Sequence, residues 1–473
     1  MRDILKRLLY FLTSLVFTNV CLADTSFETF FVDSTMRVDY YHTGIYKSDI
    51  FSLDQIHIER EWPSSKTNLI DTLNLGKYLV KVFDLKTNQL IYSRGFCTIF
   101  GEWQTTEEAK KGVYRTFHES VRFPLPKREV QLVISVRNDE NVFIDKFSTV
   151  IDPESRFVNR EKSQFPLQVK KTIDHGPCQS KVDLLILGDG YTKRELEKFN
   201  QDTEHMVDKL FSVSPFKERI TDFNIWTIHS ISQDSGIDEP RKEKWRQTIL
   251  GATFNSLDSP RYVLTTQNKQ LREISALVPY DFIAILVNSD RYGGGGIFNW
   301  FTTCYTGIQD REHQPGWWAD YVFVHELGHS MAGLGDEYYS SSVAYLDFYP
   351  QNVEPWEPNV TALLDEENVK WQEFMTTGAP IPTFWEKARF DSLNQKALES
   401  YSNKEKYNQY KQEMQEILDD PSYPSVGAFE GSGYASEGLY RPSVDCIMFS
   451  KTVKGFCPVC SAAIERMIDF TIE

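Results

Sequence analysis

The first third of the chain alternates apolar and polar residues over short runs, a pattern typical of strands with one buried face. The break at Asn138-Asp139-Glu140 has the composition of a hairpin turn. Several short strands at this spacing predict a β-sandwich over residues 24–152. No catalytic pattern occurs there, and we interpret His42, His57 and His118 as structural. The predicted strands are Arg37–His42, Gln55–Glu59, Tyr78–Leu85, Leu90–Gly95, Val130–Arg137 and Val142–Val150.

The pattern changes near residue 180. Residues 153–180 are polar and weakly periodic, as in a linker, and Val182–Leu187 is then an almost unbroken apolar run, typical of a central strand. Thr192 and Glu195 form a capping-box pattern that predicts a helix to about Phe211. The other elements predicted for residues 181–473 are strands Phe223–Ser230 and Phe282–Val287, a charged helix Lys404–Leu418 and a final helix from Ser461. We therefore expect a multidomain α+β chain in which residues 181–473 form an α/β domain.

Four consecutive glycines, Gly293, Gly294, Gly295 and Gly296, allow backbone angles and close approaches that other residues do not. Two interpretations stay open at this point. The glycines form a flexible surface loop, or they form the rim of a substrate cleft that leads into an edge strand near Ile297–Thr303. An edge strand of that kind can take up an extended peptide by β-addition.

The N-terminus has the pattern of a secretory signal. Basic residues precede the apolar run Leu8–Phe17, and small residues follow, so we expect residues 1–23 to be removed by cleavage after Ala23. A lipid anchor at Cys21 is the less favoured alternative, because Val20 is a poor residue before a lipidated cysteine. No later apolar run reaches the length of a membrane span. We expect an exported protein that is secreted, periplasmic or held at the cell surface.

Composition narrows the class of partner. The 473 residues carry a formal net charge of −16 with 41% hydrophobic and 14% aromatic residues. This length and composition allow two or three domains with a large core. The acidic balance argues against nucleic acid or an anionic membrane as a partner.

Cysteine usage leaves several interpretations open. Removal of Cys21 with the signal leaves an even number of cysteines, which permits up to three disulfides in an exported protein. Cys457-Pro458-Val459-Cys460 follows Cys446 closely, but no βαβ unit follows it to favour a thioredoxin-type redox site. A second zinc site would need a fourth ligand that the sequence does not identify, and a structural staple is favoured. The six cysteines are Cys97, Cys178, Cys304, Cys446, Cys457 and Cys460.

The strongest chemical signal is a His-Glu-x-x-His pattern. On a helix, His325 and His329 share a face, so both imidazoles can bind one ion. Glu326 can take a proton from metal-bound water. Gly333 can end the helix in a left-handed cap and bring Asp336 to the ion as third ligand. Two imidazoles and one carboxylate favour zinc over calcium or magnesium. The alternative is a pair of hydrogen-bonded core histidines.

Three segments together resemble the metallopeptidase family named for a bacterial IgA-cleaving protease, which in turn resembles the wider metzincin group. They are Leu187–Thr192, His325–Tyr338, and Asp445–Met448 taken with Cys457–Cys460. The resemblance implies a metzincin-like α/β zinc peptidase domain behind an accessory β domain. Metzincins place the glycine one residue earlier than Gly333, but the three-residue step from glycine to Asp336 is kept, with Glu337 as the alternative ligand. The resemblance also implies a methionine turn beneath the zinc, for which Met448 is the candidate.

The expected activity is hydrolysis of a protein or peptide by one zinc ion that lowers the pKa of bound water, with Glu326 as general base. Tyr338 or Tyr339 is a candidate oxyanion or substrate contact, although ordinary packing is favoured for both. Two other functions are kept: a secreted binding module with a non-catalytic metal site, and a hydrolase of a non-peptide substrate. The absence of a Gly-x-Ser-x-Gly element argues against an ester hydrolase of the α/β type.

Overall fold

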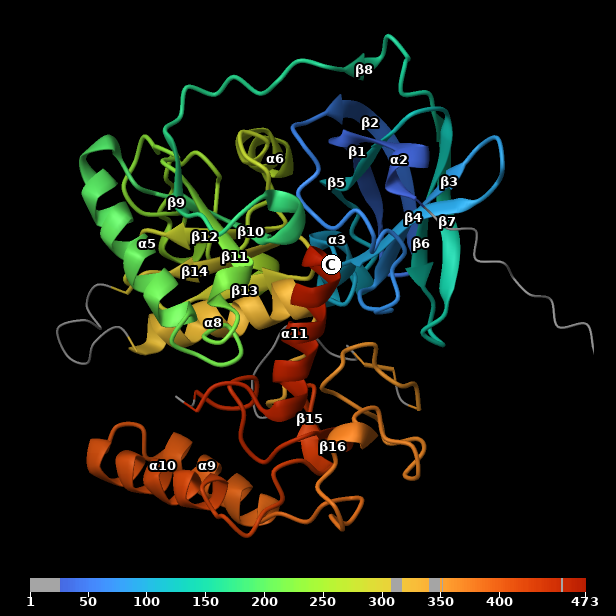
Figure 1. Ribbon diagram of the computed structural model, residues 1–473. Helices are drawn as coiled ribbons and strands as arrows, with labels where there is room; N and C mark the ends of the chain where they lie inside the picture. Colours follow the sequence, from blue (N-terminus) through green and yellow to red (C-terminus); the bar gives the residue numbers. More distant parts are fainter. Residues whose placement is uncertain (1–25, 308–316, 340–348, 351, 452–453) are drawn as a thin grey trace, which may run out of the picture.

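The computed structural model describes residues 26–307, 317–339, 349–350, 352–451 and 454–473. The predicted signal sequence and Cys21 lie outside these residues. Among the described helices, none combines the length and the apolar character that a membrane crossing requires. The molecule is a mixed α/β chain with a β domain at its N-terminal end (Figure 1).

The N-terminal domain consists of two four-stranded sheets. One has the order β5-β1-β2-β8 and the other the order β4-β3-β6-β7. Apolar side chains of the two sheets, such as Val38 of β1 and Val80 of β3, meet in one buried core, as the alternating pattern predicts. The elements are α2 (Phe27–Phe30), β1 (Phe31–Ile45), β2 (Ser48–Ile58), β3 (Tyr78–Asp84), β4 (Leu90–Phe96), α3 (Ile99–Trp103), α4 (Glu107–Lys110), β5 (Arg115–Pro126), β6 (Val130–Arg137), β7 (Phe143–Ile151) and β8 (Val158–Asn159).

Strand β5 is the one long strand of this domain that the hydrophobic pattern does not predict. It pairs with β1 along nearly its whole length, and it carries a buried carboxylate, Glu119, and a half-buried arginine. Arg122 of β5 binds Glu59 at 3.1 Å, and Glu59 also accepts from Arg37 at 2.8 Å. Arg37 reaches Glu273 of the second domain at 2.5 Å. An ion-pair network between the domains thus occupies positions where a core strand usually has apolar residues.

The segment expected to be a linker, residues 153–180, also supplies two short strands. β8 pairs with β2 of the first domain, and β9 (Val169–Ile173) pairs antiparallel with β11 of the second. An extended chain joins them across the top of the molecule (Figure 1). The segment therefore attaches to the edge of a sheet at each of its ends.

The second domain is built on a six-stranded sheet with the order β13-β14-β12-β10-β11-β9. The four central strands are parallel, and β13 and β9 run antiparallel at the two edges. Central strand β10 is buried at every position, as its unbroken apolar run predicts. The elements are β10 (Val182–Asp189), α5 (Leu196–Leu210), β11 (Phe223–Ile228), α6 (Asn268–Ser275), β12 (Phe282–Val287), β13 (Gly294–Ile297), β14 (Phe301–Tyr305), α8 (Trp317–Ala332) and α11 (Pro458–Ile472).

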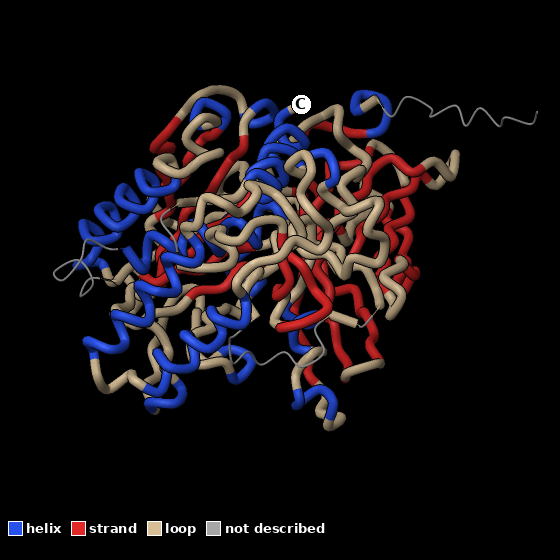
Figure 2. Tube along the Cα trace, turned by 90° about the horizontal axis from the view of Figure 1, so that it is seen from below, coloured by secondary structure: helices blue, strands red, loops and turns tan. Residues whose placement is uncertain are grey.

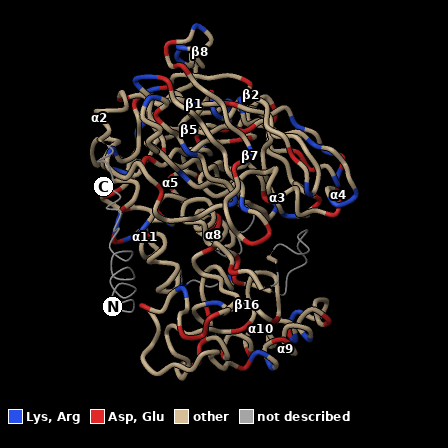
Figure 3. Tube along the Cα trace, turned by 90° about the vertical axis from the view of Figure 1, so that its right-hand side faces the viewer, with Lys and Arg blue, Asp and Glu red and all other residues tan. Residues whose placement is uncertain are grey.

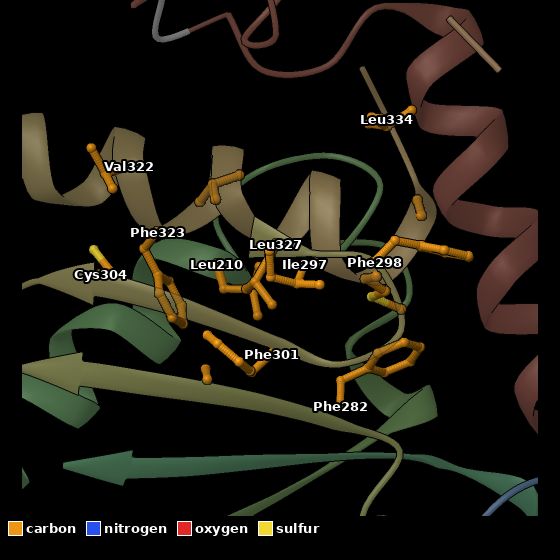
Figure 4. Close-up of a cluster of buried hydrophobic side chains, with 14 of the residues drawn as sticks. Leu210, Phe282, Ile297, Phe298, Phe301, Cys304, Val322, Phe323, Leu327 and Leu334 are labelled. Carbon is orange, nitrogen blue, oxygen red and sulfur yellow. The ribbon is translucent and has the colours of Figure 1, made fainter. Parts of the chain in front are cut away.

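Helix α8 lies against β13 and β14 and is also in contact with α5 and α11. Phe323 and Leu327 point from α8 toward the strand residues Ile297 and Phe301 (Figure 4). All four side chains are buried. The helix that carries the His-Glu-x-x-His pattern is therefore fixed on the sheet through these buried apolar side chains.

Residues 352–451 form a lobe on the other side of α8 from the sheet (Figure 1). Lys, Arg, Asp and Glu alternate along its two long helices, which agrees with the solvated helix predicted at Lys404–Leu418 (Figure 3). Seen from below, most of the long helices lie toward one side of the molecule, and many of the strands lie toward the other (Figure 2). The lobe contains α9 (Lys387–Glu399), α10 (Lys404–Leu418), β15 (Phe429–Ser432) and β16 (Ala435–Arg441). Short 3-10 turns of the chain are Cys178–Ser180, Lys193–Glu195, Ile220–Asp222, Pro240–Lys242, Ser256–Asp258 and Gln372–Phe374.

Candidate metal centre

Three side chains predicted to bind a metal converge at the end of α8. The Nε2 atoms of His325 and His329 lie 3.1 Å apart, and Asp336 Oδ1 lies 3.0 Å from the first and 3.2 Å from the second. The three ligand atoms thus form a nearly equilateral triangle. For bonds of about 2.0–2.1 Å to a tetrahedral zinc ion, ligand atoms lie about 3.3 Å apart, so the triangle fits that ion.

The opposite ring nitrogens fix the imidazole tautomers. His325 Nδ1 lies 3.0 Å from the carbonyl oxygen of Ile447, and His329 Nδ1 lies 2.6 Å from that of Leu334. Because a carbonyl only accepts, each Nδ1 carries a hydrogen and each Nε2 presents a lone pair. Two lone pairs and a carboxylate oxygen that face one another need a cation between them, so the residues fit a metal ion.

Without a metal ion, a proton would supply the positive charge between the imidazoles and the carboxylate. Burial lowers the pKa of His329, but the nearby Asp336 carboxylate outweighs it and raises the pKa to about 9. Burial also raises the pKa of Asp336, yet the two imidazoles hold it well below its usual range. Protons and a metal ion therefore compete for the same three side chains, and acid should weaken metal binding.

The turn after the helix has the predicted form. Gly333 is left-handed at φ +64°, and its N–H donates to the carbonyl of His329 at 3.0 Å. The sequence did not reveal the role of Asn359, whose side chain accepts from Gly335 N–H at 2.7 Å and donates to the Gly335 carbonyl at 2.9 Å. Asn359 fixes the loop that brings Asp336 to the histidines.

The two acidic neighbours point into different surroundings. Asp336 joins the histidines, whereas Glu337 is fully buried beside Cys446, Cys457 and Cys460. All six cysteines of the described residues are reduced, so none of the disulfides that the sequence permits is present among them. The structure therefore groups the histidines with Asp336 and leaves Glu337, the alternative third ligand, on the far side of the loop.

Tyr434 is a site residue that sequence reasoning did not single out. It lies at the tip of the β15–β16 hairpin in a left-handed conformation, φ +65°, which is strained for a bulky residue. Its hydroxyl donates a very short hydrogen bond to Asp336 Oδ2. The preceding Gly433 N–H donates to the Asp336 carbonyl at 3.0 Å. The hairpin tip therefore holds both the side chain and the backbone of the third candidate ligand.

The two predicted tyrosines have different surroundings. Tyr338 lines the cleft described below, and its ring is nearly parallel to that of His325, with centroids 6.4 Å apart. The hydroxyl of Tyr339 instead donates to Asp391 at 2.7 Å, and its ring packs against Phe449. Of the two, only Tyr338 is placed where it can meet a substrate.

The candidate general base, Glu326, is partly exposed and lines the same cleft as the histidines. Burial of its side chain raises the pKa of Glu326 above that of an ordinary carboxyl, although the neighbouring imidazoles oppose the shift. A raised pKa brings a carboxylate nearer to the value that suits proton transfer at neutral pH.

The glycine run turns out to be a strand packed on the metal helix. A Cβ at Gly296 would lie 2.4 Å from the carbonyl oxygen of Glu326, and one at Gly294 would lie 2.6 Å from Val322. Of the four glycines, Gly294 and Gly296 line the cleft, whereas Gly293 and Gly295 do not. The pairing with β14 is at odds with a flexible loop, and the rim of a substrate cleft stays a prediction. The edge strand is Gly294–Ile297, however, and not Ile297–Thr303, because the chain turns at Phe298–Trp300 and returns inside the sheet as β14.

The cleft has a volume of about 1540 Å³ and is bounded by three parts of the chain. The first domain contributes Gln104 and Asn138, and helix α10 of the lobe contributes Met414. Two cations that sequence reasoning missed, Arg261 and Lys451, also line it, and burial lowers the pKa of Lys451 to about 8. Side chains of α8, glycines of β13 and the three residues of the metal cluster line the cleft as well. A cleft of this size can admit several residues of a peptide.

Met448 lies beneath α8, as the resemblance implies. It is fully buried, and its sulfur lies 3.2 Å from the position of a Cβ on Gly328, between the two histidines. The Met448 carbonyl accepts from Glu337 N–H at 2.9 Å, so the turn also fixes the acidic loop. Its role is packing and support.

Comparison with known families covers both halves of the chain. A family model described as IgA Peptidase M64 matches residues 170–468, which is more than half of the 473 residues. A second model, described as Peptidase M64 N-terminus, matches residues 26–148. The comparison with curated proteins finds no match.

Proposed function

The chain belongs to the M64 family of IgA peptidases, and on that premise we propose that it is a zinc-dependent endopeptidase with a metzincin-like catalytic domain. The observation that carries the proposal is the triangle of His325 Nε2, His329 Nε2 and Asp336 Oδ1 in the floor of a large cleft. Three ligands with an open side are the usual arrangement of a catalytic zinc. The position of Met448 beneath α8 supports the metzincin-like comparison.

His325, His329 and Asp336 would hold the ion. When bound, zinc supplies a Lewis acid that polarises the scissile carbonyl and lowers the pKa of water at its open position. Glu326 accepts a proton from the attacking water and delivers it to the leaving amine. The Ile447 and Leu334 carbonyls keep the imidazoles in the ligand tautomer, and the Tyr434 hydroxyl keeps Asp336 in place.

The substrate would lie along β13. The glycines of this strand keep the cleft open beside Glu326, and Tyr338 faces the same space. The backbone of Arg261–Val263 already pairs with Gly294, so added pairing is confined to the remainder of the strand. Arg261 and Lys451 favour substrates with acidic groups at this end of the cleft.

The first experiment is cleavage of a diverse peptide library by zinc-loaded protein, with Glu326→Gln loaded and assayed in parallel. We expect the wild type to cut and the variant to keep its zinc but lose cleavage by roughly 10²–10⁴-fold, the usual contribution of a general base. If both hold zinc and neither cuts a peptide or a folded protein, the peptidase proposal fails. A secreted binding module with a non-catalytic ion would then take its place.

We also propose that the protein is exported, with residues 1–23 removed as a signal sequence. Expression with its own N-terminus in a bacterial host tests this. Mass spectrometry of protein from the cell envelope or medium is expected to find Asp24 as the first residue. A lipid-modified Cys21 would replace cleavage after Ala23, and an intact N-terminus in the cytoplasm would contradict export.

A further inference from the structure

A second cluster of metal-ligand side chains lies behind the acidic loop. Cys446, Cys457, Cys460 and Glu337 place one ligand atom each within 4.8 Å of all the others. Cys446 Sγ and Cys460 Sγ are 3.8 Å apart, and Cys460 Sγ lies 3.2 Å from Glu337 Oε1. All four residues are buried. The fourth ligand, which the sequence alone could not identify, is thus the neighbour of Asp336.

The local backbone is shaped to hold these sulfurs. Cys457 is the N-cap of α11, Pro458 occupies the first turn, and Cys460 follows one turn on. The backbone N–H of Cys457 donates to Cys446 Sγ at 3.3 Å, and those of Val459 and Cys460 point at Cys457 Sγ. A helix N-terminus favours negative charge, so it stabilises thiolates at this position.

The distances match an ion better than a disulfide. Bonded sulfurs lie about 2.05 Å apart, whereas sulfurs on a tetrahedral ion with bonds of about 2.3 Å lie about 3.8 Å apart. A disulfide would also leave one of the three thiols over. It would also leave Glu337 Oε2, which is buried, without a hydrogen-bond partner or a ligated ion among the described residues.

We propose that Glu337, Cys446, Cys457 and Cys460 bind a second zinc ion in a closed, four-ligand structural site. Thiolates and one carboxylate suit zinc, and four protein ligands leave no open position for substrate. The three thiols lose their protons to solvent when the ion binds. Buried Arg441, whose charge acts on both Glu337 and Cys446, offsets part of the remaining negative charge of the site.

The proposed site supports the first cluster through the backbone. Glu337 follows Asp336 directly, and its N–H donates to Met448. Cys446 precedes Ile447, whose carbonyl orients His325. An ion that fixes Glu337 and Cys446 therefore fixes residues next to one ligand and next to the hydrogen-bond acceptor of another. This role is structural, and it holds whether or not the first cluster cleaves peptides.

The first test uses the whole unaltered protein. Purified under reducing conditions and dialysed against buffer without chelator, the chain is expected to retain two zinc ions by elemental analysis. Replacement with Co²⁺ is expected to give thiolate-to-metal charge-transfer absorption in the near ultraviolet, which a site of two imidazoles and a carboxylate cannot give. Retention of a single ion and no charge-transfer band would overturn the proposal.

Alkylation of the cysteines distinguishes three thiols that bind a metal ion from a disulfide. Mass mapping of protein unfolded without reductant, in the presence of chelator, is expected to find Cys446, Cys457 and Cys460 all alkylated. A bridge between any two of them in freshly isolated protein, together with the loss of one zinc ion, would overturn the proposal in favour of a disulfide staple.

Substitutions separate this site from the peptidase site. Cys460→Ser and Glu337→Gln are expected to lose one ion and the charge-transfer band, while Cys178→Ser, a buried cysteine outside the cluster, keeps both. His329→Ala is expected to lose one ion and keep the band. If Cys460→Ser is insoluble, Glu337→Gln decides, because the amide retains the shape of the side chain. Retention of both ions and of the band by Glu337→Gln would remove Glu337 from the site. An inactive wild type with two ions and the band would overturn only the peptidase proposal.

Discussion

Asp336 and Glu337 are neighbours on one loop, but they belong to two clusters that differ in ligand type and in exposure. The cluster of His325, His329 and Asp336 offers nitrogen and oxygen and borders the cleft, where 17% of the His329 side chain is exposed. The cluster of Glu337 with three cysteines offers sulfur and is closed on all sides, with 0% of Glu337 exposed. An open three-ligand site can take part in chemistry, whereas a closed four-ligand site can only hold the chain together. Access and ligand count, more than residue type, separate the two functions.

We expect the largest effects, and the clearest contrast between the two clusters, when each of the two neighbouring carboxylates is changed to an amide. Asp336→Asn removes the anionic ligand of the open site, and losing metal catalysis worth several kcal/mol is expected to cost about 10³-fold in cleavage. Its melting temperature is expected to change by less than about 3 °C. Glu337→Gln is expected to lower the melting temperature by roughly 5 °C or more, because a buried ligand is lost. Peptide cleavage and differential scanning calorimetry on both variants check this. Equal losses of stability would contradict the assignment of a catalytic role to one cluster and a structural role to the other.

Tyr434→Phe tests how the open site is supported. The variant loses the hydrogen bond to Asp336 Oδ2 while its ring still packs on Tyr338 at 5.5 Å. Removal of a group that orients a metal ligand typically costs 10–100-fold in metal affinity or activity, so we expect about that loss in zinc affinity by competition with a chelator. Tyr339→Phe, which loses a bond to Asp391 instead, is the matched control. Equal affinities in the two variants would show that Tyr434 is only a packing residue.

Gly296→Ala tests the packing of the strand beneath the open site. The new methyl group would lie 2.4 Å from the Glu326 carbonyl oxygen and 2.9 Å from His329 Cβ, so α8 must shift. We expect a loss of about 2 kcal/mol in unfolding free energy by urea titration, typical of overpacking. Gly112→Asn, at a left-handed position with nothing within 4 Å of the new Cβ, is expected to stay within about 0.5 kcal/mol. A neutral Gly296→Ala would mean that β13 can move away from the helix.

The smallest expected effect is on the pH dependence of stability, and it comes from a buried pair of acids outside both clusters. Burial raises the pKa of Asp183 to about 7 and that of Asp281 to about 6, with the mutual repulsion adding to the first shift. Each folded pKa lies above the ordinary value near 4, so the folded state binds more protons. The contribution of this pair to stability is therefore largest at low pH and is lost as the pH rises from about 4 to about 7.

Asp183→Asn should remove much of this slope. The amide oxygen of the variant can still accept from Trp226, which donates to Asp183 Oδ1 at 2.6 Å in the wild type. We expect the variant to gain on the order of 1 kcal/mol relative to wild type between pH 5 and pH 8, measured by urea unfolding at both values. The same difference at pH 5 and pH 8 would show that the pair does not titrate in this window.

Features that depend on local pattern could be predicted from the sequence. The strands Val130–Arg137 and Phe282–Val287 and the helix Lys404–Leu418 have the predicted limits, because apolar period and capping decide them. The His-Glu-x-x-His spacing and the left-handed Gly333 likewise act over a few residues. What sequence missed depends on distant partners: β5 buries charges that are neutralised by another strand, and Glu337 meets cysteines more than a hundred residues away.

Tyr434 and Asn359 were missed for the same reason. Each is an ordinary polar residue whose role arises only when a separate loop is brought beside Asp336. The glycine strand is an intermediate case, since the composition indicated close approach but not the helix that is approached.

Helix α11 has a consequence for the modularity of the protein. It begins at Cys457, and its other end contacts the first domain, where Ser65 N–H donates to the Thr471 carbonyl at 2.7 Å and Arg94 lies over the Phe470 ring at 4.3 Å. One rigid helix therefore spans from the sulfur cluster to the β domain. The second domain, produced alone, would lose the surface that fixes this helix. We therefore expect the two domains to form one structural unit, in which the N-terminal domain cannot be removed without loss.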